Sequence, residues 1–206
     1  LVQPAIDLAT EGFPMTWSLY SAGRFFKENS PVEFLQNYFD NDNGSLTGFG
    51  EVWRQPELAA TLSLVRDNGH DGFYKGKVAK TIAKYMKDNG GLISTKDLAK
   101  YQAVERRALS SSYKDFTIYS MPPPSSGGVA LIEMMNLIEQ ADMEKIDYNS
   151  AAYVHLLAEV MRRAFADRAE YLGDPDFNPD MPLEQLMSKD FAKKRFANLD
   201  MSKASP

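Results

Sequence analysis

The sequence contains no cysteine and only two histidines among its 206 residues. Without cysteine the chain can form no disulfide, no thiolate nucleophile and no cysteine-ligated zinc site. The two histidines, His70 and His155, stand far apart, and a His-Glu-x-x-His spacing is absent. We therefore expect the chain to bind neither a metal nor another cofactor.

A basic surface and long apolar runs are missing as well. The net charge is −5 and no Lys/Arg-rich run occurs, which argues against a nucleic-acid partner. No apolar stretch approaches the roughly 20 residues of a membrane span, so we expect none in this chain. An initiator methionine and a signal sequence are also missing at Leu1, and we expect the chain to be a piece of a longer protein.

Helix-period patterns dominate what is present, and they predict a mainly α fold with one β-hairpin, a single helical domain over residues 1–206. The predicted helices cover residues 4–12, 16–27, 32–39, 56–67, 77–87, 129–140, 151–172 and 182–197, with a short one after a capping box at Ser94. The hairpin, at about 104–121, is predicted to pair residues 104–110 with the alternating residues 116–121. In the long helix 151–172 the expected buried stripe is Val154, Leu157, Met161, Ala164, Phe165 and Leu172.

The stretch Met121–Val129 stands out because three prolines precede two serines and two glycines. Prolines hold the backbone extended, a serine can cap the following helix, and glycines let backbone or ligand approach closely. Two interpretations stay open: a rigid wall near a reaction site with amides aimed at an anion, or a strand-to-helix corner that needs tight packing. The candidate pocket-wall or structural residues are Pro124, Ser125, Ser126, Gly127 and Gly128.

Other polar groups suggest weaker hypotheses. Asp40, Asp42 and Glu51 match EF-hand positions 1, 3 and 12, but the required sixth-position glycine is replaced by Ser45, which favours a solvated turn over a calcium loop. A dense charge cluster on the long helix comprises Arg162, Arg163, Asp167, Arg168 and Glu170. Its i,i+4 pairs Glu159–Arg163 and Arg163–Asp167 predict either a solvated helix face or, if buried, a lock against a partner surface. A Gly-x-Ser-x-Gly motif is absent and Ser125–Ser126 lacks a local base, so no complete catalytic constellation is present.

Several blocks of sequence resemble the large-subunit portion of γ-glutamyltransferases (γ-glutamyltranspeptidases), members of the N-terminal-nucleophile hydrolase superfamily. The blocks are Gln3–Ala9 with Gly12 and Phe13, Gln55–Ala59 with Thr61 and Leu62, Asn68 and Gly69 with Phe73–Gly76, Gly90–Ile93 with Asp97, Leu98 and Tyr101, Tyr119–Gly128, and Ala166–Arg168 with Tyr171–Phe177. They run in family order and cover nearly the whole chain.

The resemblance implies the helical part of an αββα enzyme whose precursor cuts itself into a large and a small chain. The new N-terminal threonine of the small chain is the family's nucleophile, with its own α-amine as base. It cleaves γ-glutamyl amides such as glutathione and passes the acyl group to water, an amino acid or a peptide. The implied partners are the small catalytic subunit and a γ-glutamyl peptide substrate, and the implied location is periplasmic or extracellular.

The same resemblance assigns no catalytic and no substrate-binding residue to this chain. Leu1 cannot be an N-terminal nucleophile, the family's threonine block would begin beyond Pro206, and the arginine that grips the substrate carboxylate would precede Leu1. Two alternatives remain open: an acylase of the same family acting on cephalosporin side chains, and a stand-alone helical binding or scaffold module without chemistry.

Overall fold

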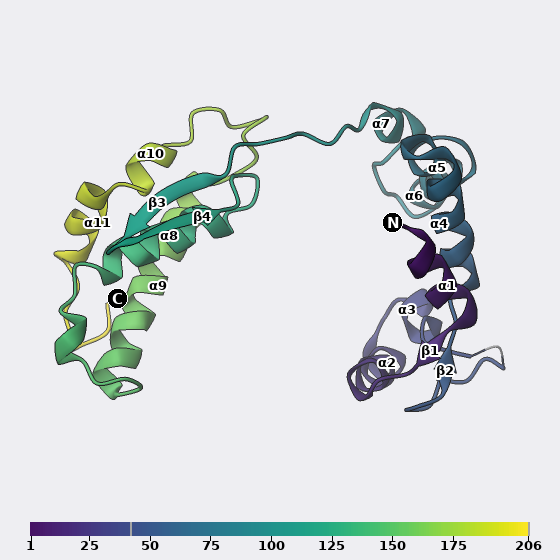
Figure 1. Cartoon of the computed structure of the whole chain (residues 1–206), viewed down its shortest axis with the longest axis horizontal. Helices are drawn as coiled ribbons and strands as arrows, with labels where there is room; N and C mark the ends of the chain where they lie inside the picture. Colours follow the sequence, from purple (N-terminus) through teal and green to yellow (C-terminus); the bar gives the residue numbers. More distant parts are fainter. Residues whose placement is uncertain (42, 206) are drawn as a thin grey trace. The chain divides into compact units, whose positions relative to one another are not determined.

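The computed structural model describes residues 1–41 and 43–205, and it is mostly helical, which confirms the predicted class (Figure 1). The chain divides into two compact units, Leu1–Ala103 and Val104–Pro206. The expected single domain over residues 1–206 stays a prediction. Among the described residues, no helix is both long enough and apolar enough to cross a membrane.

The first unit consists of helices joined by turns and longer loops, with one small antiparallel strand pairing. Its helices are α1 (Gln3–Glu11), α2 (Trp17–Asn29), α3 (Glu33–Asn37), α4 (Pro56–Asn68), α5 (His70–Tyr74), α6 (Gly76–Asp88) and α7 (Thr95–Lys100). Strand β1 (Phe13–Pro14) pairs antiparallel with β2 (Val52–Trp53). The sequence predicted only one strand pair, because strands of two residues are too short to show alternation.

Local signals set the helix ends that the sequence predicted best. Gly12 ends α1 with a φ of +82°, and a Cβ placed there would lie 2.6 Å from the carbonyl oxygen of Trp53. The predicted capping box at α7 is confirmed: the Ser94 hydroxyl accepts from the Asp97 amide, and the Asp97 carboxylate accepts from the Ser94 amide. Residues 70–74, which lie between the predicted helices 56–67 and 77–87, form the short helix α5.

Two apolar clusters hold the first unit together. Met15, Phe39 and Trp53 are buried in one cluster, where the rings of Phe39 and Trp53 lie 5.2 Å apart. Ile6 and Ala9 of α1 pack against Ala59 of α4 in the other. The β1–β2 pairing therefore carries Trp53 into the core although it contributes little regular sheet.

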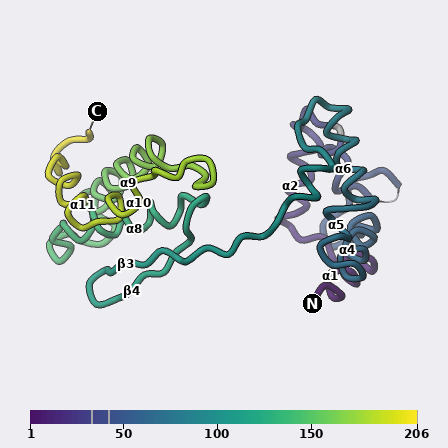
Figure 2. Tube along the Cα trace, turned by 90° about the horizontal axis from the view of Figure 1, so that it is seen from above, coloured from purple at the N-terminus to yellow at the C-terminus, as the bar shows by residue number. Residues whose placement is uncertain are grey.

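The second unit is built around one helix. Its elements are β3 (Leu109–Tyr113), β4 (Phe116–Ser120), α8 (Gly127–Ile138), a 3₁₀ turn η1 (Met143–Lys145), α9 (Ala151–Tyr171), α10 (Leu183–Leu186) and α11 (Lys189–Phe196). Helix α8 contacts both strands of the hairpin and also α9, α10 and α11 (Figures 1 and 2). The buried centre consists of Leu137, Leu156, Val160 and Ala192.

The hairpin is present, but its first strand was predicted too early. β3 begins at Leu109, not at Val104, and pairs Leu109 with Ser120 and Tyr113 with Phe116. The turn is shorter than expected and places Lys114 at a φ of +47°. Because a two-residue turn sets the register, the polar residues 110–112 are drawn into the strand despite their modest strand propensity.

The tail and the long helix also differ from the prediction. The single helix expected over 182–197 is divided into α10 and α11, because Ser188 starts a new helix by accepting from the Phe191 amide at 3.1 Å. In α9, the predicted stripe was wrong: Val154, Met161 and Phe165 are exposed, and Ala164 alone of the predicted six is buried. The buried face carries Leu156, Val160 and Ala164 together with three charged residues, Glu159, Arg163 and Asp167.

Candidate functional site

The proline–serine–glycine block, residues 122–128, joins β4 to the start of α8. Pro123 and Gly128 are buried, whereas Pro124, Ser125 and Gly127 are exposed. The block thus has a packed side and a free side. Whether Pro124–Gly128 form the wall of a pocket stays a prediction.

The two glycines of the block have different surroundings. A Cβ on Gly128 would lie 2.0 Å from the carbonyl oxygen of Met121, so the first turn of α8 rests directly on the backbone that leaves β4. A Cβ on Gly127 would meet only the Ser125 hydroxyl, at 3.6 Å. Close backbone approach therefore occurs at Gly128 and not at Gly127.

Ser126 does not cap α8 as the sequence suggested. It precedes the helix in an αR conformation and its side chain makes no capping hydrogen bond, because capping requires a more extended backbone. Its hydroxyl instead accepts a hydrogen bond from Nε of Arg168 at 2.7 Å. The block is thereby tied to α9.

Next to Arg168, Asp167 points into the unit and pairs with α11. Arg195 donates to both oxygens of Asp167, from Nε at 2.8 Å and from Nη2 at 3.0 Å. The predicted Arg163–Asp167 pair is therefore not formed. The predicted Glu159–Arg163 pair is formed, with 2.6 Å between Oε2 and Nη1, and it is buried.

Glu133 of α8 completes this group beneath the block. Its side chain is 1% exposed, and its Oε1 has no hydrogen-bond partner among the described residues. Burial, and then the neighbouring Asp167 carboxylate, raise the pKa of Glu133 to about 8, while Arg195 acts in the opposite direction. At neutral pH Glu133 is therefore a neutral acid.

This arrangement binds helices together and does not supply a nucleophile. Ser126 faces a guanidinium, which cannot accept its proton, so the serine is not activated. The two histidines belong to separate units: Nε2 of His70 lies 3.0 Å from the Tyr101 carbonyl, and Nε2 of His155 lies 2.9 Å from the Asp200 carbonyl.

The described residues of the candidate calcium loop do not support the calcium hypothesis. Asp40 is paired with Lys27 at 2.8 Å, and Glu51 accepts from the Gly48 amide at 2.8 Å. Asp42 lies outside the described residues. Among those described, no group of three or more His, Cys, Asp or Glu side chains is placed to hold a metal ion.

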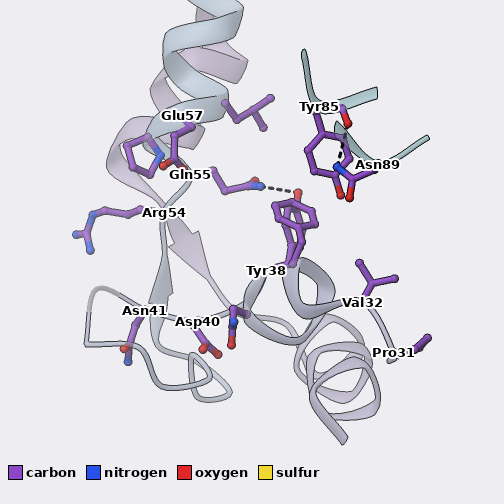
Figure 3. Close-up of a pocket in the computed structure, with 14 residues that line it drawn as sticks. Pro31, Val32, Tyr38, Asp40, Asn41, Arg54, Gln55, Glu57, Tyr85 and Asn89 are labelled. Atoms are coloured by element: carbon purple, nitrogen blue, oxygen red, sulfur yellow. Dashed lines mark hydrogen bonds between the residues drawn. The ribbon is translucent and has the colours of Figure 1, made fainter. Parts of the chain in front are cut away.

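A separate cleft of about 1340 Å³ lies on the first unit (Figure 3). Its walls carry the aromatic rings of Phe34, Tyr38 and Tyr85, and Gln55 donates to the Tyr38 hydroxyl at 2.7 Å. Among the described residues that line it there is no serine, threonine or histidine, so it offers no nucleophile and no imidazole base. Sequence reasoning did not find this cleft.

Sequence reasoning also missed Glu133 and Arg195. The sequence did carry a signal for Glu133, because it is the only acidic residue within the apolar run Val129–Ile138. A carboxylate among residues that are usually buried is a candidate for an unusual environment. Arg195 carried no such signal, because it follows Lys193 and Lys194, and adjacent basic side chains are usually solvent-exposed.

The two glycines give a matched test of the packing. Gly128→Ala should lower the free energy of unfolding by about 1–3 kcal/mol, because the new methyl group has to displace the Met121 backbone. Gly127→Ala should leave it unchanged or raise it by up to about 1 kcal/mol, because alanine favours the helix. Urea unfolding of both variants in the full-length protein measures the difference, and equal effects would contradict the packing described.

Glu133 should make stability depend on pH. The folded protein keeps the Glu133 proton up to about pH 8, whereas the unfolded chain releases it near 4.5. The contribution of protonated Glu133 to the free energy of unfolding is thus fully present below pH 4.5, and it is lost as pH rises towards 8. Glu133→Gln, which keeps a donor for Asp167, should flatten the unfolding free energy across that window. Glu170→Gln, an exposed site on α9, is the control; equal slopes in both variants would contradict the prediction.

Comparison with known proteins places this geometry in a family. The sequence profile of the family described as gamma-glutamyltranspeptidase matches residues 1–206. The chain is similar to the glutathione hydrolase proenzyme of Escherichia coli (strain K12), with 40% identity over 213 residues, covering 100% of this chain and 36% of that protein. It is also similar to the acylase ACY 1 proenzyme of Pseudomonas sp. (strain SE83), with 36% identity covering 99% of this chain and 36% of that protein.

A solved structure agrees with these sequence relatives. The γ-glutamyltranspeptidase of Helicobacter pylori superposes with a TM-score of 0.90 at 36% identity, covering 99% of this chain and 58% of that chain. The chain spans about a third of the length of the curated relatives it matches. It belongs to the γ-glutamyltranspeptidase family.

Proposed function

We propose that this chain is part of the large subunit of a precursor that cleaves itself and then hydrolyses γ-glutamyl amides such as glutathione. The observation that carries the proposal is the match of the whole chain, at 40% identity, to about a third of a glutathione hydrolase proenzyme. The reacting groups then belong to the parts of the protein outside residues 1–206. No catalytic or substrate-binding residue is assigned to this chain.

The proposed chemistry needs no histidine. An N-terminal threonine hydroxyl attacks the γ-glutamyl carbonyl, and its own α-amine, with a pKa near 8, accepts the proton. Backbone amides hold the oxyanion, and the amine of the substrate leaves. Water, an amino acid or a peptide then takes the γ-glutamyl group, which regenerates the threonine.

In this proposal the second unit supports the catalytic subunit, which is its partner. The β3–β4 hairpin extends the sheet of an αββα enzyme, which is consistent with the 72% and 73% exposure of Phe116 and Tyr119 on β4. The block at 122–128 fixes the start of α8 next to that hairpin. We place the complete protein in the periplasm or outside the cell.

An acylase acting on cephalosporin side chains is the second candidate. It is favoured by the similarity to an acylase proenzyme that also extends over 99% of this chain. Both activities need the same self-cleaved precursor, so the large-chain residues described here do not separate them.

Activity assays separate the candidates. The 206-residue chain alone should show no turnover of a chromogenic γ-glutamyl anilide above a heat-killed control, because it lacks an N-terminal threonine. The full-length protein should turn over this anilide faster than it releases the side chain of a cephalosporin. Faster cephalosporin cleavage would favour the acylase, and no activity on either substrate would favour a scaffold.

Serine substitutions test whether the block acts through its shape. Ser125→Ala and Ser126→Ala in the full-length protein should keep kcat within about tenfold of the parent, since removal of a true oxyanion donor costs ~10²-fold or more. Ser126→Ala removes only the contact with Arg168. Loss of turnover in a folded, cleaved Ser125→Ala variant would place the block in the active site proper.

A further inference from the structure

Ser205, the last described residue of the chain, is held against α9 by two buried charged side chains. Glu159 is 3% exposed and Arg163 is 7% exposed, and they form an ion pair one helical turn apart. Both also reach beyond α9 to the segment that follows α11. Ser205 receives contacts from each of them.

Arg163 uses its whole guanidinium for this purpose. Nη1 donates to Oε2 of Glu159 at 2.6 Å, and Nε donates to the Arg195 carbonyl at 3.2 Å. Nη2 donates to the Asn198 carbonyl at 3.1 Å and to the Ser205 hydroxyl at 3.2 Å. A planar guanidinium with several fixed donors sets direction as well as distance.

Glu159 holds the same serine from the other side. Its Oε1 accepts from the Ser205 amide at 3.0 Å, and its Oε2 accepts from the Ser205 hydroxyl at 2.5 Å. The Ser205 hydroxyl, then Arg163 and the Ser205 amide, lower the pKa of Glu159 to about 2. Arg162 adds a hydrogen bond to the Ser205 carbonyl. The side chain, amide and carbonyl of one residue are thus all engaged.

This pattern differs from ordinary packing of a chain segment. Residues 201–204 are exposed, and Ser202 bonds only to Asp200 within the same turn. Exposed terminal segments of this kind are usually poorly ordered. Here, charge-assisted hydrogen bonds hold Ser205, although the four residues before it are exposed. The contacts fix where the backbone lies at Ser205.

We propose that Glu159, Arg163 and Ser205 form a clamp that positions the segment leading to the self-cleavage site of the precursor. The inference rests on the proposed function, in which the chain continues beyond residue 206 to the threonine of the small subunit. In the cleavage one peptide C–N bond breaks and one water is consumed: its oxygen ends on the new carboxylate, and a proton goes to the new amine. The clamp residues are positioning residues, because they touch no reacting atom.

Positioning is the effect expected of such a clamp because self-cleavage depends on near-attack geometry. Reacting atoms have to lie about 3–3.5 Å apart, and a displacement of about 1 Å can cost ~10²-fold in rate. A segment free to move at residue 205 would spend little time in that geometry.

The test measures the rate of self-cleavage in the purified full-length precursor by gel densitometry, together with its thermal midpoint. Ser205→Ala removes the hydroxyl shared by Glu159 and Arg163, and we expect cleavage to slow about tenfold at an unchanged midpoint. Ser205→Thr restores a hydroxyl and should restore the parent rate. Ser202→Ala, in the same segment, is the matched control and should cleave like the parent.

Glu159→Gln tests the other half of the clamp and should slow cleavage by about 10²-fold. If that variant does not fold, the comparison of Ser205→Ala with Ser205→Thr and Ser202→Ala decides the proposal. Parent-like cleavage of Ser205→Ala while the parent precursor cleaves overturns the clamp and leaves the proposed function standing. A parent precursor that never cleaves overturns the proposed function, and the clamp with it.

Discussion

The second unit depends on the burial of charge along α9. Glu159, Arg163 and Asp167 are spaced one turn apart and all face inward. Removing such groups from water costs several kcal/mol per ion, and this cost is offset only when each charged group pairs with an opposite charge in good geometry. Arg163 partners Glu159, Arg195 partners Asp167, and Glu133 keeps its proton. The Asp167–Arg195 pair fixes the placement of α9 against α11, because sliding either helix by a turn would leave the buried Asp167 carboxylate without its partner.

The position of the proline–serine–glycine block depends on this packing of α9. Asp167 locks α9 to α11, and the next residue, Arg168, reaches Ser126 at the start of α8. Gly128 lets the same helix begin directly against the Met121 backbone. The end of the hairpin and the start of α8 are therefore held from two sides, by a side-chain hydrogen bond and by backbone packing. Neither contact involves a group able to act as a base.

The sequence predicts what local chemistry decides and misses what distant partners decide. Gly12 and the Ser94–Asp97 box mark helix ends through contacts within a few residues, and the structure has these ends. The start of β3 was missed because its register depends on the turn at Lys114. At the candidate site, one of the two serines was predicted to cap α8, but the Ser126 hydroxyl bonds to an arginine 42 residues away.

The buried face of α9 shows the same limit more clearly. An apolar-in rule selected Val154, Met161 and Phe165, and they are exposed in this unit. No pattern along one helix reveals that Arg195 and Ser205 will approach from later in the chain. The family resemblance indicates the function, because it rests on whole blocks of sequence. It does not predict which side chains form these contacts.

Three apolar residues of α9 are exposed, although Leu156, Val160 and Ala164 of the same helix are buried beside its charged residues. Val154, Met161 and Phe165 follow one another at seven- and four-residue steps, which places them along one side of α9. Exposing such an apolar stripe to water is unfavourable, and apolar surface of this kind promotes self-association. Residues 104–206 prepared on their own would therefore be prone to aggregate, and polar substitutions on that stripe would be the natural way to keep them in solution.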